Sequence, residues 1–389
     1  MQPGLTRRRT RELLLTEAPA GRGPEFDRFA QLLFDVLHLD YRDQLERLKE
    51  LHARANDPQA ADPGAAAQLS EALQRLLSQG HYRRIEAREL EHALQVEAVF
   101  RVRLHVRFED FEELALYARG SRRNQEFGSD WFGLRRKPIE VEYYERVALF
   151  ARSDPARHST SSGERPIQLK LFENIPAADI EMLLPNTAVG MRPIDHAVIL
   201  VPALLGGVGA VAKLGASLAL LWFLVLFWLG LRDQPPSRVD RAAMMACGVG
   251  IFAFASHVLR QIGRFRQRKA EFMQALSQNL YFKNLDNDAG VFHRLADEAE
   301  EAECKEALLI YALLERSDRG LSEVELDRAV GEWWQRQDPW GERPSSAEGL
   351  RQLSELGLVL LDGGRYRALA LPRALARLET RWAARARRA

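Results

Sequence analysis

An uninterrupted apolar run constrains this sequence more than any other feature. It reads AVILVPALLGGVGAVAKLGASLALLWFLVLFWLGLR and occupies residues 197–232. Up to Leu231 it holds 35 residues and one formal charge, Lys213. A helix that crosses a bilayer needs about 20 apolar residues. The run is too long for one such helix and too short for two, so the role of Lys213 decides how it is divided.

With Lys213 as a boundary, the chain contains two matched apolar segments. Residues 214–231 and residues 242–259 each comprise 18 residues without a formal charge. At 1.5 Å per residue, each covers about 27 Å as a helix, which is close to the thickness of the hydrocarbon core. The polar turn RDQPPSRVDR separates them. The pattern predicts a two-helix transmembrane hairpin whose membrane anchors are Lys213, Arg232, Arg241 and Arg260.

The first apolar run can be divided into an approach segment and a span in two ways. Residues 197–212 contain Pro202, Gly206, Gly207 and Gly209, so we interpret them as an approach segment in the interface or against the first span. In a rival register the first span covers residues 198–220 and buries Lys213. A lysine at that depth costs at least about 2.5–3.5 kcal/mol unless it has a partner, and it would then be a functional residue. We favour the register in which Lys213 is a membrane anchor.

Basic residues set the expected orientation. The segment RQIGRFRQRK follows the second apolar run, and this excess of positive charge places both long flanks on the cytoplasmic side. The basic N-terminus lacks the apolar core of a secretory signal. The expected localisation is therefore integral and multi-pass, in a bacterial inner membrane, with both termini cytoplasmic. The chain has 55 basic and 54 acidic residues, so no overall charge points to nucleic acid.

The region before the apolar runs alternates between two periodicities. Helical spacing covers residues 26–54 and 65–79, whereas residues 100–109 alternate apolar and polar side chains as a half-buried strand does. Further strands are predicted at residues 113–119, 139–143, 146–152 and 167–173. The predicted fold class is α+β with an antiparallel sheet. The predicted domains are a solvated basic arm at 1–23, an α+β domain at 24–190, a membrane segment at 191–270 and a C-terminal domain at 271–389.

The block from Asn284 to Cys304 contains the only metal-like pattern. NLDNDAG does not place oxygen ligands at EF-hand positions in either register, so we interpret it as turn and helix-cap chemistry. Beyond it, a helix carries the weak candidate ligands His293, Asp297, Glu301 and Cys304. Residues 297–306 are acidic throughout, as a solvated face would be. We therefore assign no metal and no cofactor. The two cysteines, Cys247 and Cys304, exclude a disulfide framework.

The last hundred residues have the order of a winged helix. Helical patterns at 305–316, 322–335 and 346–356 precede two short strands at 359–361 and 366–369. The third helix carries Glu348, Arg351 and Glu355 and lacks the basic face that DNA reading requires, so we expect protein contact and no nucleic acid. The terminal helix is rich in arginine. It would lie on an anionic membrane surface or form a solvated tail, and both readings stay open.

Four segments resemble one known family. These are YYERVALFAR, IQLKLFENIPAADIEMLLPNT, VPALLGG and, above all, LYFKNLDNDAGVFHRLADEAEEAECKEALL, which begins at Leu280. They resemble the domain of unknown function 3754 family, which includes transmembrane protein 143 of animal mitochondria and plastid and cyanobacterial relatives. The resemblance covers residues 26–371. It implies a two-span membrane protein and supplies no reaction, and the composition suggests a bacterial member.

These patterns lead to three functional hypotheses. We expect an uncharacterised two-span protein that acts as a membrane-anchored interaction or scaffold protein. The alternatives are a metal-dependent enzyme or regulator that uses the block from Asn284 to Cys304, and an oligomeric channel with Lys213 in its pore. The sequence has no nucleophile elbow, phosphate loop or metal-binding histidine pair, so no catalytic residue is assigned. The expected partners are the lipid bilayer and an unknown protein, with homo-oligomerisation left open.

Overall fold

The chain forms two compact units. The first comprises Met1–Ala93, Arg107–Ile180 and Asn284–Ala389, and the second comprises Leu94–Val106 and Glu181–Lys283. The computed structural model describes residues 5–17, 22–57, 62–86, 89, 103–106, 108–130, 135–154, 166–185, 187–190, 283–339 and 343–387, together with the single residues 229, 252, 256, 259, 260, 263 and 267.

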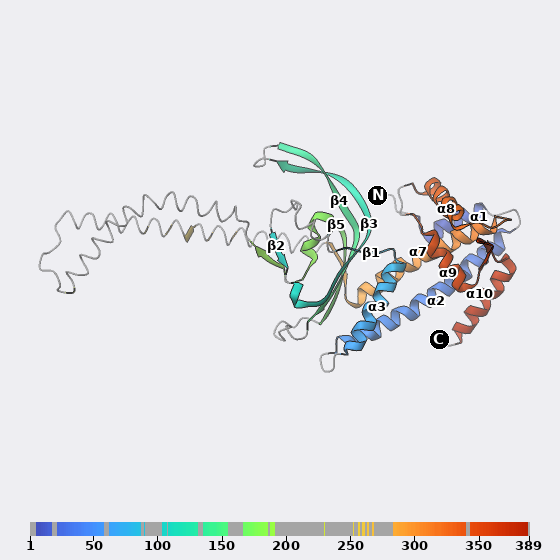
Figure 1. Cartoon of the computed structure of the whole chain (residues 1–389), viewed down its shortest axis with the longest axis horizontal. Coiled ribbons are helices and arrows are strands. Elements are labelled where there is room, and N and C mark those ends of the chain that lie inside the picture. Colours follow the sequence, from blue (N-terminus) through green and yellow to red (C-terminus); the bar gives the residue numbers. More distant parts are fainter. Residues whose placement is uncertain are drawn as a thin grey trace. The chain divides into compact units, whose positions relative to one another are not determined.

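Three helices open the first unit (Figure 1). They are α1 (Arg7–Thr16), α2 (Gly23–Ala55) and α3 (Pro63–Gln79). Asp62 caps α3, because its Oδ1 accepts the backbone N–H of Gly64 at 2.9 Å and of Ala65 at 3.1 Å. The predicted helices at 26–54 and 65–79 are confirmed. The first segment differs from the expected solvated arm, because Leu14 of α1 is fully buried and anchors the helix in the core.

A five-stranded antiparallel sheet follows, in the order β1-β3-β4-β5-β7. Its strands are β1 (Arg83–Arg84), β3 (Phe111–Asp130), β4 (Arg135–Ser153), β5 (Ile167–Pro176) and β7 (Asn284–Asn287). The predicted strands at 113–119 and 167–173 are confirmed, and those at 139–143 and 146–152 belong to the single strand β4. The α+β fold class with an antiparallel sheet therefore holds.

The second unit contains one described strand pair. Strand β2 (Arg103–Val106) pairs antiparallel with β6 (Thr187–Gly190), and the 3-10 helix η2 (Ala177–Leu183) leads toward it. Within the predicted strand at 100–109, residues Arg103–Val106 form β2 and Phe108–Asp110 form the 3-10 turn η1, so the strand ends before Phe108. Residues 100–102 and 107 lie outside the described part of the chain.

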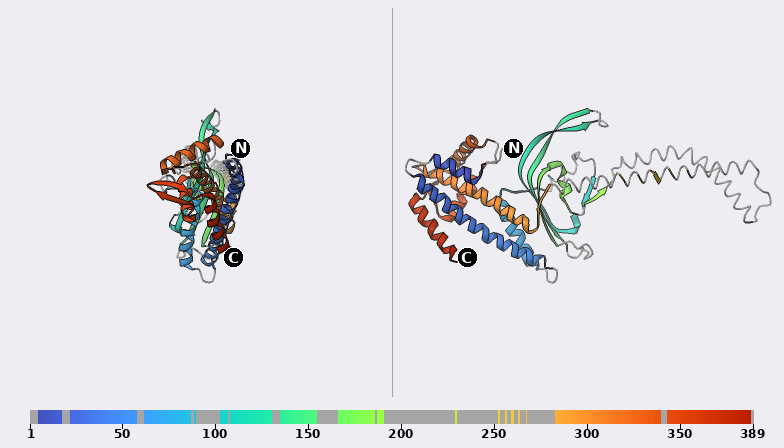
Figure 2. Two further views of the ribbon diagram at one scale, coloured as in Figure 1. Left: turned by 90° about the vertical axis from the view of Figure 1, so that its right-hand side faces the viewer. Right: turned by 180° about the vertical axis from the view of Figure 1, so that it is seen from behind.

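Helix α7 (Ala289–Glu315) is the central element of the first unit. Its first half packs Val291, Phe292 and Leu295 against the sheet, α3 and the C-terminal half of α2. Its second half packs against α1, the N-terminal half of α2 and the C-terminal helices. Helices α2 and α7 lie side by side (Figure 2, right) and run antiparallel through the two cores. Regions that the sequence patterns separated as two domains thus share one compact unit.

The C-terminal elements occur in the predicted order. Helices α8 (Glu323–Gln337) and α9 (Ser346–Leu356) precede the hairpin β8 (Val359–Asp362) and β9 (Arg365–Ala368), and α10 (Leu371–Ala386) ends the chain. A capping box of Ser322 and Glu325 opens α8. Helix α10 packs on α2, where Leu371, Ala374 and Leu378 are buried. It is therefore part of the core rather than a solvated tail.

The contact between α7 and α9 depends on Gly349. A Cβ at this position would lie 2.3 Å from Ile310 Cδ1 and 3.1 Å from the backbone carbon of Glu306. Gly349→Ala is expected to lower the free energy of unfolding by about 1–3 kcal/mol, although alanine is the better helix former by about 1 kcal/mol. Urea denaturation followed by circular dichroism measures it.

The matched control is Gly331→Ala in α8. A Cβ there meets only the flexible end of the Arg343 side chain, at 3.1 Å. That variant should be unchanged or about 1 kcal/mol more stable, since only helix propensity remains. Equal gains in stability for both variants would contradict the close approach of the two helices.

The predicted transmembrane hairpin is not supported. In the part of the chain that the structure describes, no helix is both long and apolar enough to cross a bilayer. The longest described helices, α2 and α7, carry charged residues along their lengths and bury their apolar residues against protein. The fold class is therefore corrected to α+β without the hairpin. The same finding overturns three further predictions, namely the two-span membrane scaffold, the channel and the multi-pass inner-membrane localisation.

The segments on which that prediction depended lie almost wholly outside the described residues. These are the approach segment at 197–212 and the two runs at 214–231 and 242–259. The assigned anchors Lys213, Arg232 and Arg241 also lie outside. Arg260 is described and exposed, and its Nε donates to the carbonyl of Ser256 at 3.2 Å.

Candidate functional site

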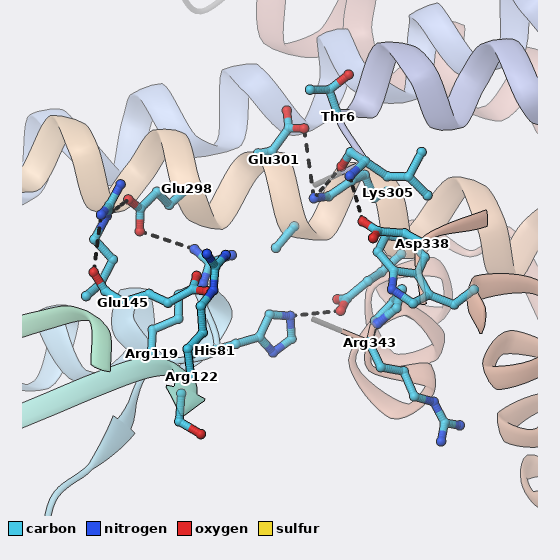
Figure 3. Close-up of a pocket in the computed structure, with 18 of the residues that line it drawn as sticks. Thr6, His81, Arg119, Arg122, Glu145, Glu298, Glu301, Lys305, Asp338 and Arg343 are labelled. Carbon is cyan, nitrogen blue, oxygen red and sulfur yellow. Dashed lines mark hydrogen bonds and ion pairs between the residues drawn. The ribbon is translucent and has the colours of Figure 1, made fainter. Parts of the chain in front are cut away.

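A polar cavity of about 860 Å³ lies between the sheet and α7 (Figure 3). Eight separate segments of the first unit line it: residues 5 and 6, the end of α3, the three strands β3, β4 and β5, α7, the end of α8 and the loop before α9. Charged side chains of both signs dominate the lining. The principal ones are His81, Arg119, Arg122, Glu145, Arg146, Glu173, Glu298, Glu301, Lys305, Glu306, Asp338 and Arg343.

The sheet forms one wall of the cavity at three residues that lie across from one another on β3, β4 and β5, and two of them have a positive φ angle. Arg119 pairs with Arg146 and Ser121 with Tyr144, so Gly120 lies across from Glu145. On the other side of β4, Asn174 lies across from the same residue. Gly120 has φ +63° and Asn174 has φ +52°. A side chain at Gly120 would collide with Glu145, whose Cγ and Cδ lie 2.9 Å from the position of a Cβ. The positive φ favours glycine there, and a side chain would also displace that of Glu145.

His81 enters the cavity from the end of α3. Its φ is +61°, and it occupies the left-handed position after the helix where glycine is usual. The backbone N–H of Tyr82 bonds to the carbonyl of Leu77 at 2.8 Å, which closes the helix end. A β-carbon in this conformation costs of order 1 kcal/mol or more. The sequence places histidine there although Gly80 directly precedes it.

The imidazole of His81 contacts a buried carboxylate. Its Nε2 lies 2.8 Å from Oε1 of Glu306, a residue on α7 that is 1% exposed. The same oxygen accepts the backbone N–H of Ser345 at 2.6 Å. The second oxygen, Oε2, is buried and has no hydrogen-bond partner among the described residues. Only one of the two carboxylate oxygens of Glu306 therefore has a hydrogen-bond partner among the described residues.

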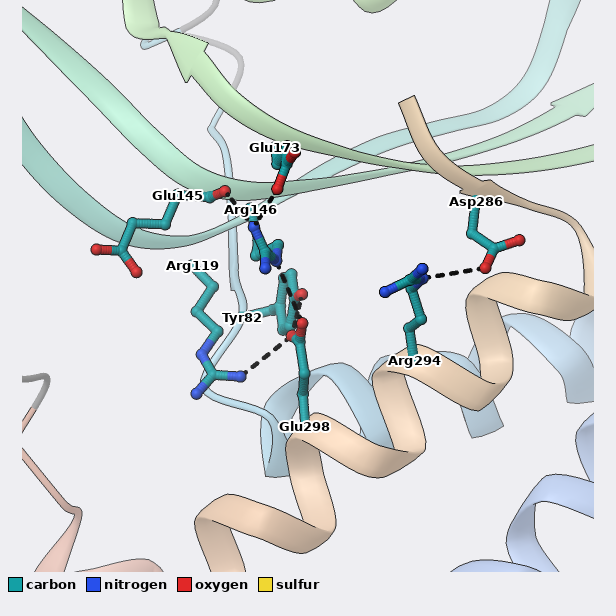
Figure 4. A network of polar contacts seen from close by, with 8 residues as sticks. All are labelled: Tyr82, Arg119, Glu145, Arg146, Glu173, Asp286, Arg294 and Glu298. Atoms are coloured by element: carbon teal, nitrogen blue, oxygen red, sulfur yellow. Dashed lines mark hydrogen bonds and ion pairs between the residues drawn. The ribbon is translucent and has the colours of Figure 1, made fainter. Parts of the chain in front are cut away.

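Glu298, two turns earlier on α7, is fully engaged (Figure 4). The Tyr82 hydroxyl donates to its Oε2 at 2.6 Å, and the Arg119 guanidinium donates to the same oxygen at 3.2 Å. Arg146 donates to its Oε1 at 3.3 Å and also to Glu173 at 3.1 Å. Burial, with the neighbouring Glu298 charge, raises the pKa of Tyr82, so this hydroxyl stays a donor. The network ties α7 to the sheet.

The N-terminal segment closes one side of the cavity, where Leu5 and Thr6 line it. The backbone N–H of Leu5 donates to Asp338 at 3.0 Å, and Lys305 Nζ donates to the carbonyl of Leu5 at 3.1 Å. The backbone N–H of Arg7 donates to Glu301 at 2.6 Å. Residues 5–7 are therefore held to α7 and to Asp338 at the end of α8 by side chains.

The acidic stretch of α7 is not the solvated face that the charge pattern suggested. Glu300, Glu303 and Glu306 are all buried, because α7 is enclosed by helices on several sides. Each has a partner from a distant segment. Glu300 pairs with Arg7 and with His38, whose Nδ1 lies 2.9 Å away, and Glu303 lies 3.4 Å from Arg351. A one-dimensional pattern could not show these partners.

The structure separates the weak metal candidates of α7. His293 and Asp297 are exposed, Glu301 is partly exposed and pairs with Arg7, and Cys304 is fully buried in the core. In the described residues, no group of three or more histidine, cysteine or acidic side chains is arranged to hold a metal ion. In the NLDNDAG segment, Asn284–Asn287 form β7, and Asp288 precedes α7 without a side-chain cap. Most of this segment therefore forms the edge strand of the sheet instead of a cap for α7.

The sequence of the sheet identifies the family. Residues 111–290 match the family described as protein of unknown function (DUF3754). The matched region contains Gly120, Glu145 and Asn174, which lie across from one another on β3, β4 and β5. Residues 111–290 of this chain belong to the DUF3754 family. The expected resemblance is thereby confirmed at the level of the family. No solved structure matches the chain.

The DUF3754 match covers one wall of the cavity. Gly120, Glu145 and Asn174 fall inside it, whereas His81 and the acidic residues of α7 fall outside. Sequence reasoning missed the site because its parts come from eight separate segments. The expected protein partner of this DUF3754 protein stays a prediction.

Proposed function

We propose that the cavity between the sheet and α7 binds a small polar molecule, which makes this chain a ligand-binding protein. The observation that carries the proposal is the concentration of unusual backbone at the cavity. His81 and Asn174 are two of three described residues other than glycine with positive φ, and both line it. Gly120 lines it as well. Strained positions cluster at binding and active sites, where the surrounding fold holds them in place.

The size and chemistry of the cavity agree with this role. Its volume of about 860 Å³ lies within the range of small-molecule sites. Such sites are usually mostly apolar, whereas this lining presents carboxylates and guanidinium groups together. A ligand that matches it must offer hydrogen-bond donors and acceptors. The buried ends of the side chains are held in place by the Glu298 network, so the site is preformed.

Thermal unfolding in the presence of polar compounds, grouped by chemical class, tests the proposal. One class is expected to raise the melting temperature, because a ligand at 100 times its Kd stabilises the folded state by about 2.7 kcal/mol. Ser121→Trp places a large side chain at the exposed rim of the cavity and should abolish the rise.

Asn124→Trp is the matched control. Asn124 is exposed on the same strand and does not line the cavity, so this variant should keep the effect of the ligand. The proposal fails if no class of compound raises the melting temperature, or if Ser121→Trp and the wild type respond equally.

A further inference from the structure

The two glutamates of α7 that line the cavity differ in how well their oxygens are satisfied. Glu298 and Glu306 lie eight residues apart, about 12 Å along the helix axis and on the same side of it. Glu298 accepts from Tyr82, Arg119 and Arg146. Glu306 accepts from Ser345 and contacts His81 through Oε1, and its Oε2 lacks a hydrogen-bond partner among the described residues. A buried acceptor without a donor costs about 1–3 kcal/mol or more when charged.

The charges around Glu306 add a second argument. Three carboxylates line this end of the cavity, from Glu301, Glu306 and Asp338. The guanidinium of Arg343 pairs at 2.7 Å with Asp327, which does not line the cavity. Lys305 and His81 are then the remaining basic side chains of the lining at this end. Glu301 is likewise paired outside the lining, with Arg7. Glu306 and Asp338 therefore face Lys305 and His81 at this end, and a cationic guest is favoured by the charge-assisted hydrogen bond that it can donate to Glu306.

From these observations we infer that the ligand of the cavity carries a primary ammonium group, and that Glu306 receives its N–H donors. The inference rests on the proposed function and specifies the ligand's chemistry. Ala302 lines the cavity one turn before Glu306 and is small, so the body of the ligand has room to lie along α7 there. An ammonium donor supplies the hydrogen bond that Oε2 lacks, and a charged donor makes a stronger bond to a carboxylate than a neutral one does.

Three compounds with the same four-carbon chain length test the inference by isothermal titration calorimetry on the full-length protein at constant ionic strength. 1,4-Diaminobutane and 4-aminobutanoate carry an ammonium group, whereas butanedioate carries only carboxylates. The two amines are expected to bind and butanedioate is not. Glu306→Gln should weaken binding of the amines by about 10- to 100-fold, since it removes the charge that the ammonium group pairs with.

Two further variants separate the effect from a general change in α7. Asp297→Asn removes one negative charge from an exposed position of the same helix outside the cavity, and it should leave amine binding unchanged. Ala302→Leu fills the space beside Glu306 without altering the carboxylate, and it should abolish amine binding. This second variant keeps the test decisive if Glu306→Gln fails to fold.

The outcomes distinguish the two proposals. Binding of butanedioate alone, blocked by Ser121→Trp, would leave the cavity a ligand site and overturn the assignment of an ammonium group. Amine binding that is equal in the wild type and Glu306→Gln would overturn the role of Glu306. Binding of none of the three compounds also overturns the ammonium assignment, whereas the wider set of compounds under Proposed function decides whether the cavity binds a ligand at all.

Discussion

Trp333→Ala is expected to lower the free energy of unfolding by about 3–5 kcal/mol, the range for removing a large aromatic side chain from a core. Trp333 is 1% exposed and lies on α8 in the core that joins α1, α2 and α7. Its Nε1 also donates to Glu17 Oε2 at 3.1 Å, which holds the end of α1. The loss therefore combines a cavity with a broken hydrogen bond between distant segments. Chemical denaturation followed by circular dichroism measures it.

Trp382→Ala is the matched control for that experiment. Trp382 lies on α10 and is 43% exposed, so its removal should cost less than about 1 kcal/mol. Similar losses for the two variants would mean that α8 does not pack in the core as described. A broadened unfolding transition for Trp333→Ala would show that the two cores of the unit unfold separately.

Glu303→Gln is expected to make the protein more stable at pH 8 than the wild type, by as much as about 3 kcal/mol, and to change it little at pH 5. Burial raises the pKa of Glu303 to about 7, and the Tyr41 hydroxyl and the Arg351 guanidinium oppose this shift. A carboxyl that titrates near 7 when folded and near 4.5 when unfolded contributes stability that is fully present below pH 4.5. That stability is lost as the pH rises to about 7.

The glutamine variant cannot ionise and so should lack this loss. Urea denaturation at pH 5 and pH 8 gives the comparison. Glu355→Gln serves as the control, because Glu355 pairs with the same Arg351 at 2.5 Å and is 56% exposed as a side chain. It should change the free energy of unfolding by less than about 1 kcal/mol at both pH values. If Glu303→Gln is the less stable protein at pH 8, then the ionised Glu303 is held by Arg351 at a net gain.

The secondary structure of the first unit was largely predictable, since its signals are local. The apolar stripe of α2, the proline and aspartate at the start of α3, and the alternation along β3 to β5 each act within one element. The family could also be identified, because the segments that carry the resemblance overlap the matched residues. The capping box of Ser322 and Glu325 likewise marked the start of α8.

The site was not predictable, because it depends on contacts between distant residues. Glu306 meets His81 across more than two hundred residues, and Glu298 meets Arg119 and Arg146 across about a hundred and fifty or more. An acidic helix is usually solvated, and nothing near α7 in the sequence indicates the arginines and histidines that neutralise it. The transmembrane interpretation failed differently. That prediction relied on the hydropathy of the sequence alone, and no helix that the structure describes supports it.

The position of β7 and α7 in the chain has a consequence for biosynthesis. Strand β7 completes the sheet and α7 covers its apolar face, yet both follow β5 by about a hundred residues. At about 5–20 residues per second, the ribosome needs roughly 5–20 s to add that stretch. Throughout this interval the emerging sheet displays Phe150, Leu169 and Leu171 without the helix that buries them in the finished protein. The first unit therefore cannot complete its sheet or this core until residues 284–299 have been synthesised.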